Sequence, residues 1–413
     1  MAITIKQPMV YFSPLYDKNA FVIDSSYNDE DNFYYLMDIV DANGTLTSSR
    51  VPSDPYGFGV FDPNFITNNK VTYNFNPIAT TSEDNTDCFY QYKVSYGSIS
   101  DGSYDTQTST NIVNGFNMNF QLDEDSDLDN YFLDDPYSKF LTDFDNTNEI
   151  TLTRSDYYTF NFIYGNFNSY SSGYSHPYKL NYKFYKTNGS TDTFKYTVSA
   201  SYEYLSTSTF EANPEHLVQT IGVGVQNLLG MTMDGISVPL TESYFDDIEY
   251  YEVFAEYSAS EKISITYTVR LKCEGSHNRY QIFYLNSLGA FDGLTFTTEN
   301  KMTQKQKTST FLRDPWKSNG TGSYTYTQGN GGLITHDKTI EKELTVNSDF
   351  VYENDLPIYE RFFQSPVHIL YKNGKEYPMV LTNSSINLED KMNRKIYQIK
   401  YTFAYANKTK LNI

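Results

Sequence analysis

Residues 178–202 read YKLNYKFYKTNGSTDTFKYTVSASY. Apolar side chains alternate with polar ones on both sides of Asn188-Gly189, and they are Tyr178, Leu180, Tyr182, Phe184, Phe194, Tyr196, Val198, Ala200 and Tyr202. In an extended strand every second side chain lies on the same face, so each half presents one largely aromatic face. Asn-Gly between two alternating runs is a strong hairpin signal. The stretch therefore predicts two antiparallel strands joined by a tight turn.

The same pattern recurs along the chain. Further candidate strands are residues 9–12, 20–24, 32–40, 158–164, 251–257, 263–271 and 397–407, and residues 365–385 contain another Asn-Gly hairpin. The chain has 40 Tyr and 29 Phe, and only 20% of its 413 residues are charged. Aromatic side chains suit the pleated surface of a sheet. We predict an all-β protein, mainly antiparallel, made of several β-sandwich modules with one or two short helices.

The segment DPYGFGVFDPNF, residues 54–65, allows two interpretations. A phosphate-binding loop needs a train of glycines that opens a helix. Gly57 and Gly59 fit, but Asp62 stands where the third glycine should be, and no helical pattern follows Pro63. We therefore interpret the segment as a strand that carries large side chains on one face.

Two segments carry helix signals. Residues 213–230 begin with an Asn cap followed by Pro214 at the first helical position, although two glycines oppose a helix there. Residues 348–364 are expected to form one helix, or two that are separated at Pro357.

Four segments are expected along the chain. They are an N-terminal β-sandwich (1–80), a central β-rich domain with long hairpins (88–300), an extended contact loop (301–340), and a C-terminal β domain with a short helix (341–413), which can form one unit with 279–300. Residues 80–87 are polar and predict a linker or a hairpin tip. The segment 301–340 is rich in Gly, Thr and Asn, which is typical of a disordered segment or of a loop that orders on assembly.

The net charge of −20 is unevenly distributed. Residues 1–150 have 6 Lys/Arg against 24 Asp/Glu, residues 151–300 have 9 against 16, and residues 301–413 have 16 against 11. So acidic a chain has too few cations to neutralise phosphates, which argues against stable nucleic-acid binding. An acidic surface that faces a neighbour's basic surface would align subunits, and a solvated acidic face is the alternative.

Targeting signals are not visible. No run of about 18 apolar residues is present, so no membrane insertion is expected. The N-terminal residues show no basic and apolar pattern of a secretory signal. Cys88 and Cys273 lie far apart in the sequence, so we expect synthesis in a reducing cytoplasm, with a disulfide between them as the open alternative.

Catalytic and metal-binding motifs are present only in incomplete form. Asp125, Asp127 and Asp129 have calcium-loop spacing, but Asn130 and Pro136 stand where such a loop needs glycine and glutamate, so a solvated acidic loop is the other interpretation. The five histidines show no metal-ligand spacing, and the Ser-His pair at 175–176 lacks the glycine of a nucleophile elbow. We predict a protein that is not an enzyme and that has no cofactor.

Aromatic residues in the polar segment are the interface candidates. Trp316, the only tryptophan, lies in RDPWKSNG (313–320), where a large ring is costly unless a partner covers it, with burial in the core as the alternative. Tyr324 and Tyr326 lie in the same segment. Surface rings also stack on sugars, so glycan binding remains a second interpretation of the abundant tyrosines.

Several stretches resemble virion proteins of tailed bacteriophages that infect Bacteroidota, a group that includes the crAss-like phages. They are YFSPLYDKNAFVIDS (11–25), NFYYLMDIV (32–40), the segment 54–66, RYQIFYLNSLGAFDGLTF (279–296), FFQSPVHIL (362–370), and YPMVLTNSSI with YQIKYTFAYAN (377–386 and 397–407). The resemblance covers both ends of the chain and carries no catalytic motif. Residues 90–250 take no part in it.

The resemblance implies a tail, neck or baseplate component of β-sandwich modules that assembles into a ring or collar in the virion. Gly57 and Gly59 would then be strand or bulge positions that allow close packing. The acidic front of one subunit would meet the basic back of the next, and an acidic channel lining would repel passing DNA. A receptor-binding or glycan-binding adhesion module is the alternative, and a glycan-cleaving tail enzyme is the third.

Overall fold

The computed structural model describes most of the chain. The described residues are 3–101, 103–104, 108–120, 128–133, 135–145, 147–163, 179–198, 210, 217–236, 239–257, 261–273, 278–326, 331–383 and 396–412. The chain forms two compact units: unit 1 comprises Met1–Cys273 and Leu285–Asp292, and unit 2 comprises Glu274–Tyr284 and Gly293–Ile413.

The predicted fold class is confirmed. Strands account for 51% of the described residues and helices for 13%, in a β-sandwich-like, all-β architecture. Most strand pairs are antiparallel, and β10 with β2 and β11 with β17 pair in parallel. No helix in the described part of the chain is long and apolar enough to cross a membrane.

Unit 1 contains the following elements. Its strands are β1 (Ile3–Gln7), β2 (Phe12–Pro14), β3 (Phe21–Ser25), β4 (Tyr34–Asp41), β5 (Gly44–Val51), β6 (Phe58–Phe61), β7 (Glu83–Asp84), β8 (Phe89–Ser100), β9 (Ser103–Tyr104), β10 (Thr108–Phe116), β11 (Glu149–Leu152), β12 (Thr159–Ile163), β13 (Lys179–Lys186), β14 (Thr191–Thr197), β15 (Val218–Gly222), β16 (Ile248–Glu256) and β17 (Tyr267–Leu271). Its helices are α1 (Pro63–Thr67), α2 (Val225–Gly230) and the 3-10 helices η1 (Asn68–Lys70), η2 (Thr86–Cys88), η3 (Leu128–Tyr131), η4 (Asp143–Asp145) and η6 (Glu242–Asp247).

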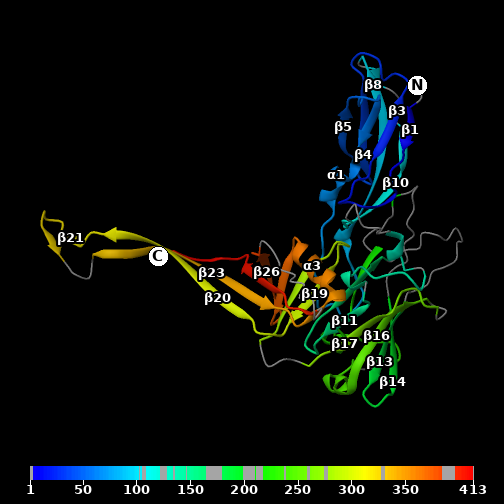
Figure 1. Cartoon of the computed structure of the whole chain (residues 1–413). Coiled ribbons are helices and arrows are strands. Elements are labelled where there is room, and N and C mark those ends of the chain that lie inside the picture. Colours follow the sequence, from blue (N-terminus) through cyan, green and yellow to red (C-terminus); the bar gives the residue numbers. More distant parts are fainter. Residues whose placement is uncertain are drawn as a thin grey trace. The chain divides into compact units, whose positions relative to one another are not determined.

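The first half of unit 1 is a β-sandwich (Figure 1, blue to cyan). The sheet β1-β3-β6 packs on a second sheet with the order β2-β10-β8-β4-β5. Phe21 of β3 and Phe61 of β6 share one core cluster with Tyr35 of β4 and Tyr92 of β8. The alternating apolar residues of these strands therefore meet between the sheets.

The second half of unit 1 also stacks two sheets, β11-β17-β16-β13-β14 and β12-β15-β7. The predicted hairpin is confirmed as β13–β14, in which Tyr182 pairs with Phe194 and Gly189 turns with a φ of +81°. The buried Tyr182 donates its hydroxyl proton to the carbonyl of Gly222 in β15 at 2.9 Å, and Tyr251 of β16 bonds the next carbonyl at 2.6 Å. These phenols link the two sheets.

Unit 2 contains the remaining elements. They are β18 (Tyr280–Leu285), β19 (Phe291–Phe296), β20 (Lys301–Arg313), β21 (Trp316–Ser318), β22 (Tyr324–Tyr326), β23 (Gly332–Asn347), β24 (Val351–Tyr352), η7 (Glu353–Asp355), α3 (Leu356–Gln364), β25 (His368–Lys372), β26 (Lys375–Leu381), β27 (Ile396–Tyr397), β28 (Lys400–Tyr405) and β29 (Thr409–Asn412). The described residues form a sheet with the order β19-β18-β25-β26-β28-β23-β20, and β29 also pairs with β23. Phe362 of α3 packs its ring 4.8 Å from that of Tyr401, which fixes α3 on one face of this sheet.

Strand pairing corrects the expected segment boundaries. β8 and β10, which lie in the expected central domain that begins at residue 88, complete the N-terminal sheet by pairing with β4 and β2. Within the expected linker, β7 pairs with β15. β18 and β19 belong to the same sheet as β25, β26 and β28. The observed sheets differ from the expected segments because strands far apart in sequence pair with one another.

The helix predictions hold in part. In the segment 213–230, the described residues begin at Leu217. A helix forms only over Val225–Gly230, because Val218–Gly222 is the strand β15. The expected helix within 348–364 is α3, with Pro357 in its first turn, where a missing N–H costs nothing.

The glycine segment also differs from expectation. The strand β6 begins at Phe58, and the large side chain of Tyr56 before it is exposed, while Gly59 and Phe61 face the core. A helix, α1, does begin at Pro63. Gly59 is a close-packing position, because an added Cβ would overlap the ring of Tyr35.

Candidate interaction surface

A long β-hairpin extends from the sheet of unit 2 (Figure 1, yellow). β20 and β23 pair from Lys301↔Thr345 to Arg313↔Gly332. β28 and β29 pair with β23 between Asp337 and Asn347. From Gly332 to His336, the described part of β23 pairs with β20 alone. We call residues 301–309 with 337–347 the arm stem, and residues 310–326 with 331–335 the arm tip. The expected contact loop is thus mostly strand, because polar strands without an apolar face resemble a loop in sequence.

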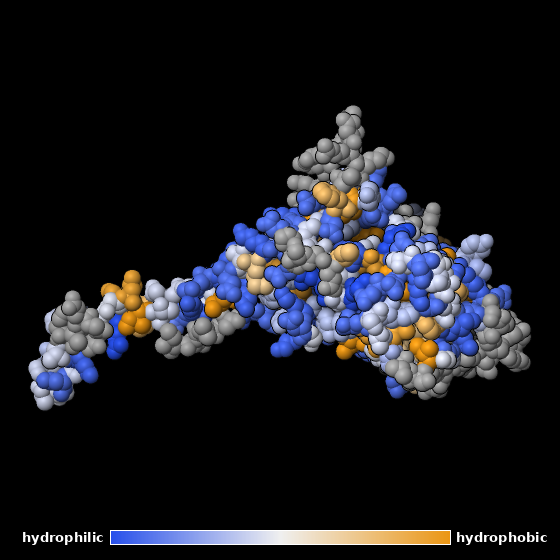
Figure 2. Space-filling view, turned by 90° about the horizontal axis from the view of Figure 1, so that it is seen from below, coloured by the Kyte–Doolittle hydropathy of each residue, from blue (hydrophilic) through white to orange (hydrophobic). Residues whose placement is uncertain are grey.

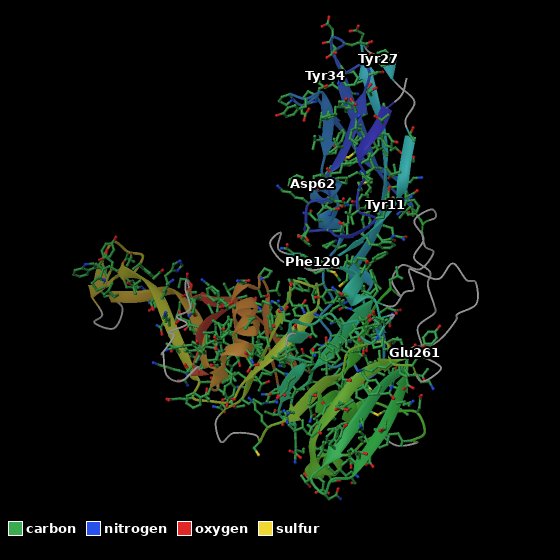
Figure 3. All side chains as sticks on the ribbon, turned by 45° about the vertical axis from the view of Figure 1, so that its right-hand side comes forward. Tyr11, Tyr27, Tyr34, Asp62, Phe120 and Glu261 are labelled. Carbon is green, nitrogen blue, oxygen red and sulfur yellow. The ribbon has the colours of Figure 1, made fainter. Side chains whose placement is uncertain are left out.

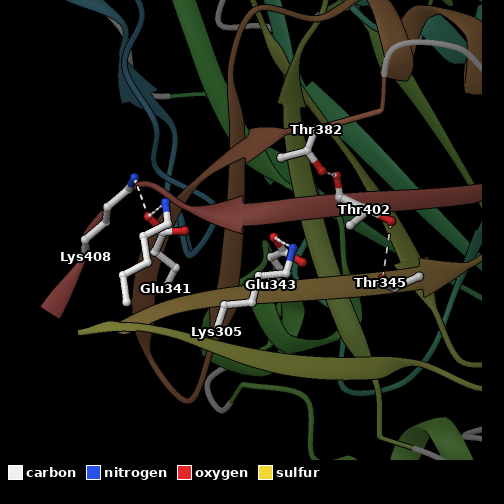
Figure 4. Close-up of polar contacts among 8 residues, drawn as sticks. Lys305, Glu341, Glu343, Thr345, Thr382, Thr402 and Lys408 are labelled. Atoms are coloured by element: carbon white, nitrogen blue, oxygen red, sulfur yellow. Dashed lines mark hydrogen bonds and ion pairs between the residues drawn. The ribbon is translucent and has the colours of Figure 1, made fainter. Parts of the chain in front are cut away.

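The arm stem is polar and carries ion pairs (Figure 4). Lys305 Nζ lies 2.5 Å from a carboxylate oxygen of Glu343 across the two strands. Glu341 accepts from two ammonium groups, Lys307 at 3.1 Å and Lys408 at 2.9 Å. These two lysines hold the pKa of Glu341 below its usual value, Lys408 having the larger effect. The ion pairs join the stem to the segment that leads into β29.

Lysines on the edge strand β20 oppose pairing with a strand of another chain. A long exposed edge is a template for pairing with another chain, and lysines on an edge oppose such pairing. Lys301, Lys305 and Lys307 are two or four residues apart, so they lie on one face of the edge strand. A second copy that paired edge to edge would bring these charges together, so the stem is unsuited to self-pairing.

The arm tip is apolar on both faces. Leu312 and Leu333 are direct cross-strand partners, and they are 77% and 75% exposed. Phe311 pairs with Ile334 on the opposite face and is 48% exposed. Figure 2 shows these hydrophobic side chains as an orange group that the hydrophilic stem separates from the body of unit 2. A two-stranded hairpin has no interior, so such side chains are buried only when a partner covers them.

A short second hairpin ends the arm. β20 stops before Pro315, and Gly331 lies so close that an added Cβ would be 2.6 Å from the Pro315 ring. β21 and β22 then pair Trp316 with Tyr326. The loop between them is closed by Asn319, whose side-chain oxygen accepts backbone N–H bonds from Thr321 and Ser323.

The structure places two of the predicted interface residues on this surface. Trp316 is 57% exposed and Tyr324 is 66% exposed, so the alternative that Trp316 is buried in the core is wrong. Tyr326 lies in β22 opposite Trp316. Sequence reasoning missed the leucine pair, although the apolar doublet Phe311-Leu312 at the end of an otherwise polar strand was a usable signal.

The calcium candidate gains no support. Asp125 and Asp127 lie outside the described residues, and Asp129 lies in η3. No group of three or more His, Cys, Asp or Glu that could hold a metal ion occurs among the residues described. Cys88 is buried and Cys273 is exposed, and both are free thiols.

A buried carboxylate, Asp292, has a structural role. Asp292 lies at the start of β19, in the part of that strand that belongs to unit 1. It accepts bonds from the Thr142 and Tyr158 hydroxyls at 2.6 and 2.5 Å, and from the Asp143 N–H and the Asn286 side-chain amide, each at 2.8 Å. Burial raises its pKa above the usual value. All four donors are themselves buried, so the group ties internal segments together and does not face a ligand.

Comparison with known proteins adds no identification. Neither a protein-family model nor a curated protein matches the sequence. The arm tip is therefore interpreted on its own geometry.

Proposed function

We propose that this chain is a non-enzymatic structural component of a phage virion, a ring or collar protein of the tail or neck that self-assembles and docks neighbouring tail proteins. The observation that carries the proposal is the arm tip, where Leu312 and Leu333 form an exposed apolar pair at the end of a polar stem. Exposed apolar groups rimmed by polar residues are typical of protein contact sites. The resemblance at both ends of the chain supplies the virion context.

The charge distribution supports contacts between unlike surfaces. Residues 1–150 are strongly acidic and residues 301–413 are basic. Unlike surfaces form heterologous interfaces, and these close into rings when the rotation between subunits permits. Synthesis in the host cytoplasm followed by incorporation into the particle completes the proposal.

Glycan binding is the second candidate, because Trp316 and Tyr324 expose aromatic rings on one small hairpin. Sugars stack on such rings. Retention on host polysaccharide that Trp316→Ala abolishes would favour this adhesion module over the structural role.

The experiment that tests the proposal is localisation in purified particles of the encoding phage. Gold-labelled antibodies against the chain should mark the tail or neck in a fixed number of positions, and mass spectrometry should find the chain at a constant ratio to the tail proteins. Absence of the chain from intact particles would overturn the virion role.

A further inference from the structure

A second exposed apolar surface lies in unit 1, around α1. Val10, Tyr16 and Phe65 are 61%, 49% and 78% exposed. We call these three residues, together with Asp17 and Asp62, the α1 surface. Phe65 lies on α1 between the buried Asn64 and Thr67, so the helix is anchored on one side and presents the ring to solvent.

Two buried asparagines hold this surface together. Asn19 bonds both backbone groups of Val10, at 2.8 and 2.9 Å, and donates its own N–H to Asp62 at 3.2 Å. Asn64 donates to the carbonyls of Pro14 and Asp17, each at 2.9 Å, and accepts from the Tyr92 hydroxyl at 2.8 Å. Each exposed apolar residue therefore belongs to this network or adjoins a residue that does. Such a preorganised surface loses little freedom when a partner binds.

The α1 surface carries two carboxylates, whereas the arm as a whole, stem and tip, has an excess of basic residues. Asp17 and Asp62 have half-buried side chains, and Asp62 is labelled in Figure 3. The carboxylate of Asp62 accepts from Asn19, and that of Asp17 accepts from the N–H of Phe120. Residues 1–116 contain 5 Lys/Arg against 14 Asp/Glu, whereas residues 301–347 contain 7 against 4. Within the arm tip, Arg313 and Lys317 outnumber a single carboxylate, Asp314. Apolar centres with rims of opposite charge suit one another.

We propose that the arm tip of one copy docks on the α1 surface of a second copy. The inference rests on the proposed function, because it names the partner surface of the same tip. A tip that met another tip would place basic residues against basic residues, whereas a tip on an α1 surface pairs opposite charges. The contact is heterologous, so every copy offers one tip and one α1 surface to different neighbours.

Two variants separate the two halves of the contact. Leu312→Asp disables the tip and leaves the α1 surface intact, and Phe65→Asp does the reverse. Because both side chains are exposed, the fold should persist, and circular dichroism and thermal unfolding would check this. If Phe65→Asp fails to fold, Phe65→Ser would be used in its place. Tyr352→Asp and Tyr137→Asp are the matched controls, because these tyrosines are 64% and 80% exposed outside the arm tip and the α1 surface.

Light scattering on a sizing column would report the masses. We expect wild-type protein and both controls to associate, each disabled variant to be monomeric alone, and an equal mixture of the two to form a 1:1 dimer that grows no further. A mixture that stays monomeric, or a Phe65→Asp variant that associates as wild type does, would overturn the inference. In the second case the tip would still mediate assembly on another surface, so the proposed function would survive. Wild-type protein that is monomeric at every concentration would overturn both self-assembly and this contact.

Discussion

Leu312 and Leu333 face each other across the arm tip, each with about three quarters of its surface exposed. Cross-strand pairs of this kind stabilise a hairpin by about 0.2–1 kcal/mol. Because most of each leucine side chain remains exposed, most of its apolar area is available to a partner. Replacing Leu333 by Ser should therefore change the free energy of unfolding by no more than about 0.5–1 kcal/mol. The same change should weaken self-association about tenfold or more, measured by sedimentation equilibrium. Val380→Ser, an exposed change on β26, should leave the association constant unaltered.

Gly59 should tolerate no side chain. In Gly59→Ala the new Cβ would overlap the ring of Tyr35, which is fully buried and whose hydroxyl donates to the Gly57 carbonyl at 2.7 Å. The ring is therefore held at both ends, and we expect a loss of about 1–3 kcal/mol in the free energy of unfolding. Urea denaturation would measure it. Val60→Ala, next to it on the exposed side of β6, should cost clearly less; equal costs would contradict the packing argument.

Asp17 should make stability depend on pH. Burial raises its pKa from 3.8 to about 6, although the N–H of Phe120 opposes the shift. Between these values the folded chain binds more protons at Asp17 than the unfolded chain, so this group's contribution to stability falls as the pH rises from about 3.8 to 6. Asp17→Asn should gain stability relative to wild type over that interval and show a constant difference above it. Thermal unfolding at a series of pH values would test this, and a difference that is independent of pH would refute it.

Glu341 should hold β29 on the arm stem. Glu341→Gln keeps the size of the side chain but removes the charge that binds Lys307 and Lys408. Because Lys408 adjoins β29, the backbone amides of β29 should exchange a few-fold faster in Glu341→Gln than in wild type, as expected for loss of exposed ion pairs. Glu343→Gln breaks only the pair with Lys305 and should leave β29 exchange unchanged. The same exchange rate in all three proteins would show that the ion pairs do not matter.

Local signals in the sequence predicted the local structure. The Asn-Gly turns at 188–189 and 373–374 are hairpin turns with positive φ at Gly189, Asn373 and Gly374, because alternation and turn chemistry lie within one short segment. In the segment 213–230 the helix forms only over Val225–Gly230, because packing decides the rest: an added Cβ at Gly222 would overlap the carbonyl of Ala79, a contact that no local pattern reveals.

The candidate sites were accessible to sequence reasoning only in part. Trp316 and Tyr324 were identified because aromatic rings in a polar segment are unusual. The arm itself was not, because a strand that is exposed on both faces has no apolar period. Phe65 could not be identified either, since its exposure depends on the buried contacts of Asn64 with residues about fifty positions away.

The fluorescence of Trp316 would show directly whether the arm tip is covered on assembly. Trp316 is the only tryptophan and lies in the tip, so its emission reports on this surface alone. Protein concentration would be raised while mass and emission are recorded together. We predict that the emission maximum moves to shorter wavelength as the mass increases, and that Leu312→Asp abolishes both changes. An increase in mass with unchanged emission, or no increase in mass at any concentration, would show that assembly does not cover the arm tip.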